Sequence, residues 1–179
     1  VQVGGWQVGG VNRSEALLRL EERLKKLGDL PVTLEVDEPS LTLNMTAIEA
    51  GADYNANAFR AAVHELDEGN VWERAYARYH FAEEWPLEQR YNNQALRTRL
   101  SPDWEKETFG TPADAVRRIA ANDKVQYIPE KGVRRIAWDE LEARLLAKLP
   151  HDFTVLDNGD KPAALLIQLP LYTQQPKVT

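Results

Sequence analysis

The chain has 179 residues, of which 43% are hydrophobic and five are tryptophan. This apolar content suffices for one medium domain or two small lobes with a real core, and it argues against a disordered chain. The formal charge of −6 argues against nucleic-acid binding as the general role, because phosphate contacts need a net basic surface.

A helix is expected after the sequence VGGVN, with Asn12 as its cap and Glu15 completing a capping box. Its apolar positions fall on one face, namely Ala16, Leu17, Leu20, Leu24 and Leu27. Gly28 is expected to end the helix. Residues 32–36 and 41–45 then alternate around an acidic turn, which predicts an antiparallel hairpin.

The middle of the chain is expected to be mainly helical. Asp53 or Asn55 is the expected cap of a second helix, whose apolar positions are Phe59, Ala62, Val63 and Leu66. A third helix is expected at residues 70–81, followed by a strand at 85–91 and a helix at about residues 93–100.

Residues 111–120 carry two conflicting signals. Thr111 as a cap and Pro112 at the first helical position predict a helix. The apolar residues of 115–119 and 125–129, on either side of the turn-like sequence AANDK, predict a hairpin instead. We favour the hairpin.

An internal similarity supports that choice. Residues 41–66 and 125–149 both contain a strand, a glycine, a short link and a capped helix, although these generic matches could also arise by chance. We therefore expect an α+β fold, as a single medium domain or two similar small lobes built from strand–turn–helix units with antiparallel hairpins. The expected divisions are an N-terminal α/β portion with a helical segment (1–110), a C-terminal β-hairpin–helix–strand portion (111–172) and a linker to a further domain (173–179).

Each of the two similar units has a glycine before its helix, Gly51 and Gly132. We expect both glycines to occupy turns with positive φ, where a Cβ atom is unfavourable. After the second unit, a last strand is expected at residues 164–170.

Few residue patterns in the chain suit catalysis. The absence of cysteine excludes thiol catalysis, zinc–thiolate sites and disulfides. None of Ser14, Ser40 and Ser101 has the neighbouring base that a nucleophile needs, and neither His64 nor His80 has enough nearby ligands for zinc. Three glutamates lie near Trp85 in the sequence, as carboxylates and aromatic residues do in sugar-cleaving sites, namely Glu83, Glu84 and Glu88. Adjacent side chains point in different directions, so we do not expect a catalytic pair. We expect no catalytic residue, no metal and no cofactor.

Aromatic residues are concentrated between residues 72 and 104. Tryptophan and tyrosine stack on sugar faces and also offer a hydrogen bond. The candidate glycan-binding residues are Trp72, Tyr76, Trp85 and Trp104. Spacings of three and four residues among Trp72, Tyr76 and Tyr79 equally suit a helix that faces the core, so both roles stay open.

Residues 117–135 hold six cations against two carboxylates, a net charge of +4 in an acidic chain. In a hairpin, several of these cations would share one face and could contact an anionic wall polymer. The candidates are Arg117, Arg118, Lys131, Arg134 and Arg135. The alternative is a sheet edge whose charges protect it from aggregation.

Five segments resemble a known family in their order and spacing. They are VGGVNRSEALLRL, LTLNMTAIEAGADYNANAFRAAV, GNVWERAYAR, PADAVRRIAANDKVQYIPEKGVRRIAWDELEARL and IQLPLYTQQPKVT. They are similar to the peptidoglycan-binding domain that precedes the VanW domain in exported Gram-positive proteins and the catalytic domain of some L,D-transpeptidases. Only residues 80–110 depart from the family's pattern, and the family supplies no ligand-contacting motif.

The resemblance implies a non-catalytic, extracytoplasmic module that faces the cell wall, with peptidoglycan or an anionic wall polymer as its partner and no nucleic-acid partner. We expect no membrane contact by these residues, since they contain no apolar run of about 18 residues. We expect the chain to be a fragment of a longer protein that is tethered by a membrane segment before Val1. The alternative is a structural spacer or protein-interaction module without a glycan ligand.

Overall fold

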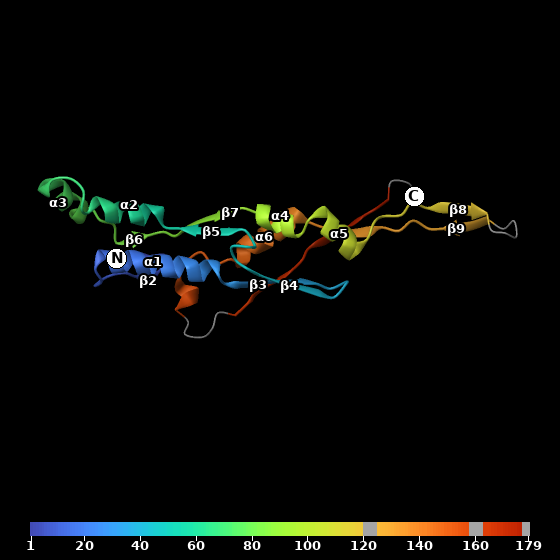
Figure 1. Ribbon diagram of the computed structural model, residues 1–179, viewed down its shortest axis with the longest axis horizontal. Coiled ribbons are helices and arrows are strands. Elements are labelled where there is room, and N and C mark those ends of the chain that lie inside the picture. The colour runs from blue at the N-terminus through green and yellow to red at the C-terminus, as the bar shows by residue number, and fades with distance from the viewer. Residues whose placement is uncertain (120–124, 158–162, 177–179) are drawn as a thin grey trace.

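The computed structural model describes residues 1–119, 125–157 and 163–176. Within these ranges it has six α-helices and 12 strands in small antiparallel and mixed sheets, so the expected α+β class is confirmed. The molecule is long and narrow (Figure 1). One end carries α3 (Val71–Tyr79), and the other carries the hairpin of β8 (Val116–Ile119) and β9 (Val125–Ile128). No helix of the described part is long and apolar enough to span a bilayer.

The first helix, α1 (Arg13–Gly28), has the expected start and end. The backbone N–H of Glu15 donates to Asn12 Oδ1 at 2.9 Å, which confirms Asn12 as the cap. The Glu15 carboxylate pairs with Arg19 one turn later, so the expected capping box is only half formed. Four residues of the expected apolar face are buried, namely Ala16, Leu20, Leu24 and Leu27. The fifth, Leu17, is partly exposed.

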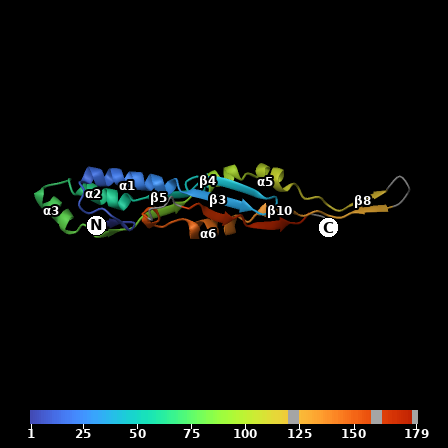
Figure 2. The same ribbon diagram turned by 90° about the horizontal axis from the view of Figure 1, so that it is seen from below.

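The central sheet lies along the middle of the molecule (Figure 2). It contains three strands in the order β11–β3–β4 (Leu165–Gln168, Pro31–Val36 and Leu41–Thr46). The expected hairpin of β3 and β4 is antiparallel, with Leu34 opposite Leu43, while β11 pairs in parallel with the other edge of β3. Helix α6 (Trp138–Lys148) packs beside β11. Segments near the C-terminus therefore share a core with the N-terminal hairpin of β3 and β4.

One continuous hydrophobic cluster runs through the molecule. Its members come from almost every element, including Val3, Leu20, Leu34, Leu96, Leu141, Phe153 and Ile167. Phe153 precedes a 3₁₀ turn (Thr154–Leu156), is fully buried and meets the ring of Trp6 edge to face. Residues of the expected N-terminal and C-terminal portions therefore share one core. Two short strands at the N-terminus pack there as well, β1 (Gln2–Val3) and β2 (Trp6–Gln7).

Of the two caps expected for the second helix, Asn55 accepts a hydrogen bond from the N–H of Asn57, the first helical residue, at 3.3 Å, whereas Asp53 does not cap the helix. Asp53 lies in a strand, β5 (Ala52–Asn55), opposite Arg90 of β7 (Glu88–Tyr91). Helix α2 (Asn57–Glu65) then begins after Ala56, which makes no side-chain cap bond. Asp53 is not the cap because pairing with β7 holds its backbone extended. In the same strand, burial raises the pKa of the Tyr54 phenol to about 12.

The turn before β5 needs glycine, as expected. Gly51 has φ of 109°, and a Cβ atom there would lie 2.6 Å from the carbonyl oxygen of Asn92. Gly132 was expected to be similar, and this prediction is wrong. It lies between the Ala113–Lys131 bridge and β10 (Val133–Ile136), outside a turn and without a positive φ.

The strand expected at residues 85–91 is divided in two. Pro86 separates β6 (Glu84–Trp85), which pairs in parallel with β1, from β7, which pairs with β5. The division arises because proline has no backbone N–H to donate. One expected strand therefore joins two small sheets.

Two short helices follow, and only the first was expected. Helix α4 (Gln94–Arg99) confirms the helix predicted near residues 93–100. Helix α5 (Pro102–Phe109) was not predicted, although Ser101 caps it by accepting a hydrogen bond from the backbone N–H of Trp104 at 3.2 Å. Proline at the first helical position and acidic residues in the first turn were the available signals.

The hairpin prediction for residues 115–129 is confirmed. Strands β8 and β9 pair antiparallel, with Arg117 opposite Tyr127. The expected turn AANDK, and with it Lys124, lies outside the described residues. Strand β10 pairs with β12 (Leu171–Gln174), so Thr173 and Gln174, expected in a linker, form part of a strand.

Candidate functional site

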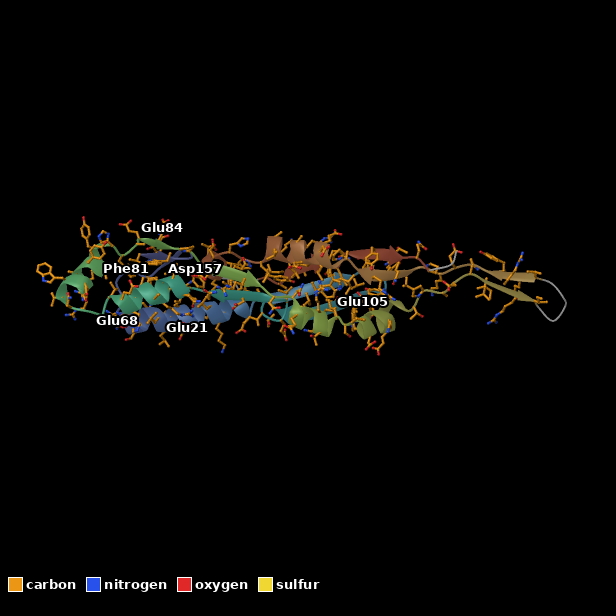
Figure 3. All side chains as sticks on the ribbon, turned by 90° about the horizontal axis from the view of Figure 1, so that it is seen from above. Glu21, Glu68, Phe81, Glu84, Glu105 and Asp157 are labelled. Atoms are coloured by element: carbon orange, nitrogen blue, oxygen red, sulfur yellow. The ribbon has the colours of Figure 1, made fainter. Side chains whose placement is uncertain are left out.

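A cavity lies at the α3 end of the molecule, between α2 and α3. It has a volume of about 770 Å³, and its lining includes Trp72, Tyr76, Phe81 and Trp85. We call it the aromatic groove. Figure 3 labels Glu68, from the link before α3, and Phe81, which follows α3, at this end of the molecule. Sites for small ligands generally occupy about 300–1,000 Å³, so the volume suits a ligand of a few rings.

Helix α3 is fixed by a complete capping box at its start. Asn70 Oδ1 accepts hydrogen bonds from the N–H groups of Trp72 and Glu73, at 2.9 and 3.1 Å. In return, Glu73 Oε2 accepts from the N–H of Asn70 at 2.7 Å. Gly69 precedes this box with φ of 80°, and a Cβ atom there would collide with Glu73 Oε2. The local sequence GNVWE therefore sets where Trp72 stands.

The floor of the groove is an aromatic cluster attached to the core. Phe59 is buried, and its ring centroid lies 6.2 Å from that of Phe81 and 6.0 Å from that of Trp85. Phe81 and Trp85 are 5.3 Å apart. Trp85 Nε1 donates to the carbonyl oxygen of Ala82 at 3.0 Å. The floor is thus held in place, and the Trp85 indole N–H is already used within the protein.

The wall of the groove is unusually exposed. Trp72 is 84% exposed and Tyr76 is 67% exposed, and α3 contains no buried residue. The Tyr76 ring lies 4.1 Å from that of His80, between centroids. These two aromatic side chains therefore do not face the core, although their spacing equally allowed that arrangement.

The groove is lined by the carboxylates of Glu65, Glu68 and Glu73 and by the imidazole of His80, and by no lysine or arginine. Glu68 Oε1 lies 3.2 Å from His64 Nε2, and Glu73 completes the capping box. Arg74 and Arg78, the cations of α3, do not belong to the lining. The groove therefore combines aromatic faces with a negative rim.

Comparison with known families matches residues 41–156 to the family described as "Putative peptidoglycan binding domain". The chain belongs to this family. The matched residues include α2, α3 and the whole aromatic groove. No curated protein and no solved structure matches the chain. The family is one of binding domains rather than enzymes, and the described residues hold no group of three or more potential metal ligands.

Three of the four residues proposed to bind glycan in this peptidoglycan-binding domain come together. Trp72, Tyr76 and Trp85 all line the groove. Trp104 does not, because it is half-buried on α5 and its ring meets that of Phe109 edge to face, 5.8 Å away. Four further lining residues were not predicted from the sequence, namely Phe81 and the three glutamates. The spacing of Glu65 and Glu68, just before Trp72, was the available signal.

The five proposed anion-binding residues do not form one surface. Arg134 pairs with Glu38 at 2.7 Å. Arg135 has a side chain only 12% exposed, and it donates to the Gly110 carbonyl at 3.2 Å and to Gln174 Oε1 at 3.1 Å. These two arginines tie segments of the protein together. The exposed cations are Arg117 and Arg118 on β8, and Lys131.

Proposed function

We propose that this chain is a non-catalytic, extracytoplasmic module that binds peptidoglycan through the aromatic groove. It would serve a membrane-tethered cell-wall protein of the VanW type, in which the neighbouring domain carries any catalytic activity. Membership of the peptidoglycan-binding family supports the partner, and the groove supplies a surface for it. The tether and the neighbouring domain rest on the resemblance alone.

The exposed faces of Trp72 and Tyr76, above the apolar floor, carry this proposal. A flat aromatic face stacks on the C–H groups of a pyranose ring, and tryptophan and tyrosine can add a hydrogen bond at the ring edge. An exposed aromatic pair without such a partner would only present apolar area to water. The groove therefore suits a disaccharide with part of its attached peptide.

A second contact with the wall is proposed at the opposite end of the molecule. Arg117, Arg118 and Lys131 are exposed there in a chain of net charge −6. They would attract an anionic wall polymer, and this attraction would be screened by salt. The alternative role, a structural spacer, is favoured by one observation, the long and narrow shape (Figure 1).

Co-sedimentation with purified sacculi distinguishes a peptidoglycan-binding module from a structural spacer. We expect the parent chain to pellet with sacculi, and Trp72→Ala with Tyr76→Ala to bind at least about tenfold more weakly through lost stacking. Tyr79→Ala is the matched control, because Tyr79 is 85% exposed on the same helix but does not line the groove. A parent chain that stays in solution would favour the spacer. Equal binding by the double variant would exclude the groove as the site.

A further inference from the structure

The charges around the groove suggest which part of a wall fragment enters it. Three carboxylates line the groove, from Glu65, Glu68 and Glu73, and no lysine or arginine does so. A neutral sugar ring does not require a negative rim. The carboxylates of the peptide stem would be repelled by this rim. Glu73 also completes the capping box of α3 and Glu68 also lies beside His64, but the negative rim that they form with Glu65 favours neither of these two groups.

A primary ammonium group fits both the aromatic faces and the negative rim of the groove. A cation over the face of tryptophan or tyrosine is attracted by the ring quadrupole. A nearby carboxylate adds Coulomb attraction for the same cation. Trp72 and Tyr76 supply exposed faces, and Glu68 lies at the same end of the molecule (Figure 3). We propose that the aromatic groove recognises a free primary ammonium group of peptidoglycan.

This inference rests on the proposed function, and two parts of the wall could supply the ammonium group. One is the side-chain amine of the diamino acid in a peptide stem that is not cross-linked. The other is a glucosamine that has lost its acetyl group. Both would place a cation close to a sugar or peptide surface that can lie on the aromatic floor of Phe81 and Trp85.

The first experiment compares native sacculi with sacculi whose amines have been acetylated with acetic anhydride. We expect the parent chain to bind the acetylated sacculi about tenfold more weakly, because acetylation removes the positive charge. Equal binding to both preparations would overturn the ammonium proposal and leave the proposed function standing. No binding to native sacculi would overturn the proposed function, and the soluble probes below would then decide the ammonium proposal alone.

The second experiment uses soluble probes, followed by NMR titration. One pair is the Nα-acetylated tetrapeptide L-Ala–γ-D-Glu–L-Lys–D-Ala, whose lysine is its one free amine, and the same peptide with the lysine acetylated as well. The other pair is the glucosamine tetramer and its fully N-acetylated form. Preference for the free amine within the first pair assigns the peptide stem, and within the second pair it assigns the sugar. Absence of such a preference in both pairs would overturn the proposal.

A matched pair of variants separates the groove from general charge attraction. Glu65→Gln with Glu68→Gln should remove most of the preference for free amines, about fivefold to tenfold. Glu73 is left intact because its carboxylate also caps α3. Glu22→Gln with Glu107→Gln is the control, since it changes the net charge equally at exposed positions outside the groove. An equal loss in both double variants would contradict recognition at the groove.

Discussion

The α3 end and the β8–β9 end of the molecule lie far apart (Figure 2), and both expose large apolar side chains. At the α3 end, Trp72 and Tyr76 stand beside a floor that packs against buried Phe59. At the other end, every residue of the two strands is exposed, including Ile119 and Tyr127. One end is a supported concave surface and the other is a protruding hairpin. Both ends are therefore exposed, and the α3 end differs from the hairpin by having a cavity with a fixed floor.

The first prediction concerns the support beneath each end. Phe59→Ala should lower the free energy of unfolding by about 3–5 kcal/mol, because it leaves a cavity under two aromatic rings. Tyr127→Ala, which removes an exposed ring from the hairpin, should change it by about 0.5 kcal/mol or less. Urea denaturation of both variants measures the difference. Similar losses in the two variants would show that the hairpin is packed as firmly as the groove.

The second prediction tests whether the capping box positions the groove wall. Asn70→Ala should destabilise the protein by about 1 kcal/mol and also weaken sacculus binding, because the first turn of α3 carries Trp72. Ser101→Ala is the matched control, since it removes a comparable cap from α5. Thermal unfolding and co-sedimentation should show a similar stability loss for both variants but a binding loss for Asn70→Ala alone. Unchanged binding by Asn70→Ala would show that the capping box is not needed to position Trp72 for binding.

The sequence predicted those elements whose signals are local. The cap at Asn12, the β3–β4 hairpin and the choice of a hairpin for residues 115–129 depend on nearby residues, and all are confirmed. Of the two caps expected for α2, Asn55 lies beside the helix start, and Asp53 does not, because its strand pairs with β7, more than 30 positions later in the chain. Helix α5 was missed although its local start signals were present.

The candidate site was predictable only in part for the same reason. The concentration of aromatic residues pointed to Trp72 and Tyr76, but only the packing of α2 against α3 shows that they face solvent over a floor. Trp104 has the same chemistry and lies against the core. Arg135 contacts residues of two distant segments, Gly110 and Gln174, so its internal role was not visible in the local charge pattern.

The third prediction, with the smallest expected effect, concerns the hairpin end. Arg117→Glu with Arg118→Glu should weaken sacculus binding about twofold to threefold at 0.01 M salt and have no effect at 1 M, where the Debye length is about 3 Å. The control is Lys25→Glu with Lys26→Glu, an equal charge change on exposed positions of α1. Equal effects of the two double variants would mean that only net charge matters and that the hairpin makes no specific contact.

The most direct test of the groove is fluorine NMR of the protein labelled with 5-fluorotryptophan, because the five tryptophans are distributed along the molecule. Each resonance can be assigned by changing one tryptophan at a time to phenylalanine. On titration with soluble peptidoglycan fragments, we expect the Trp72 resonance to shift most and that of Trp85 to shift less. The resonances of Trp6, Trp104 and Trp138 should stay in place. Shifts at Trp104 or Trp138 with none at Trp72 would contradict binding at the aromatic groove.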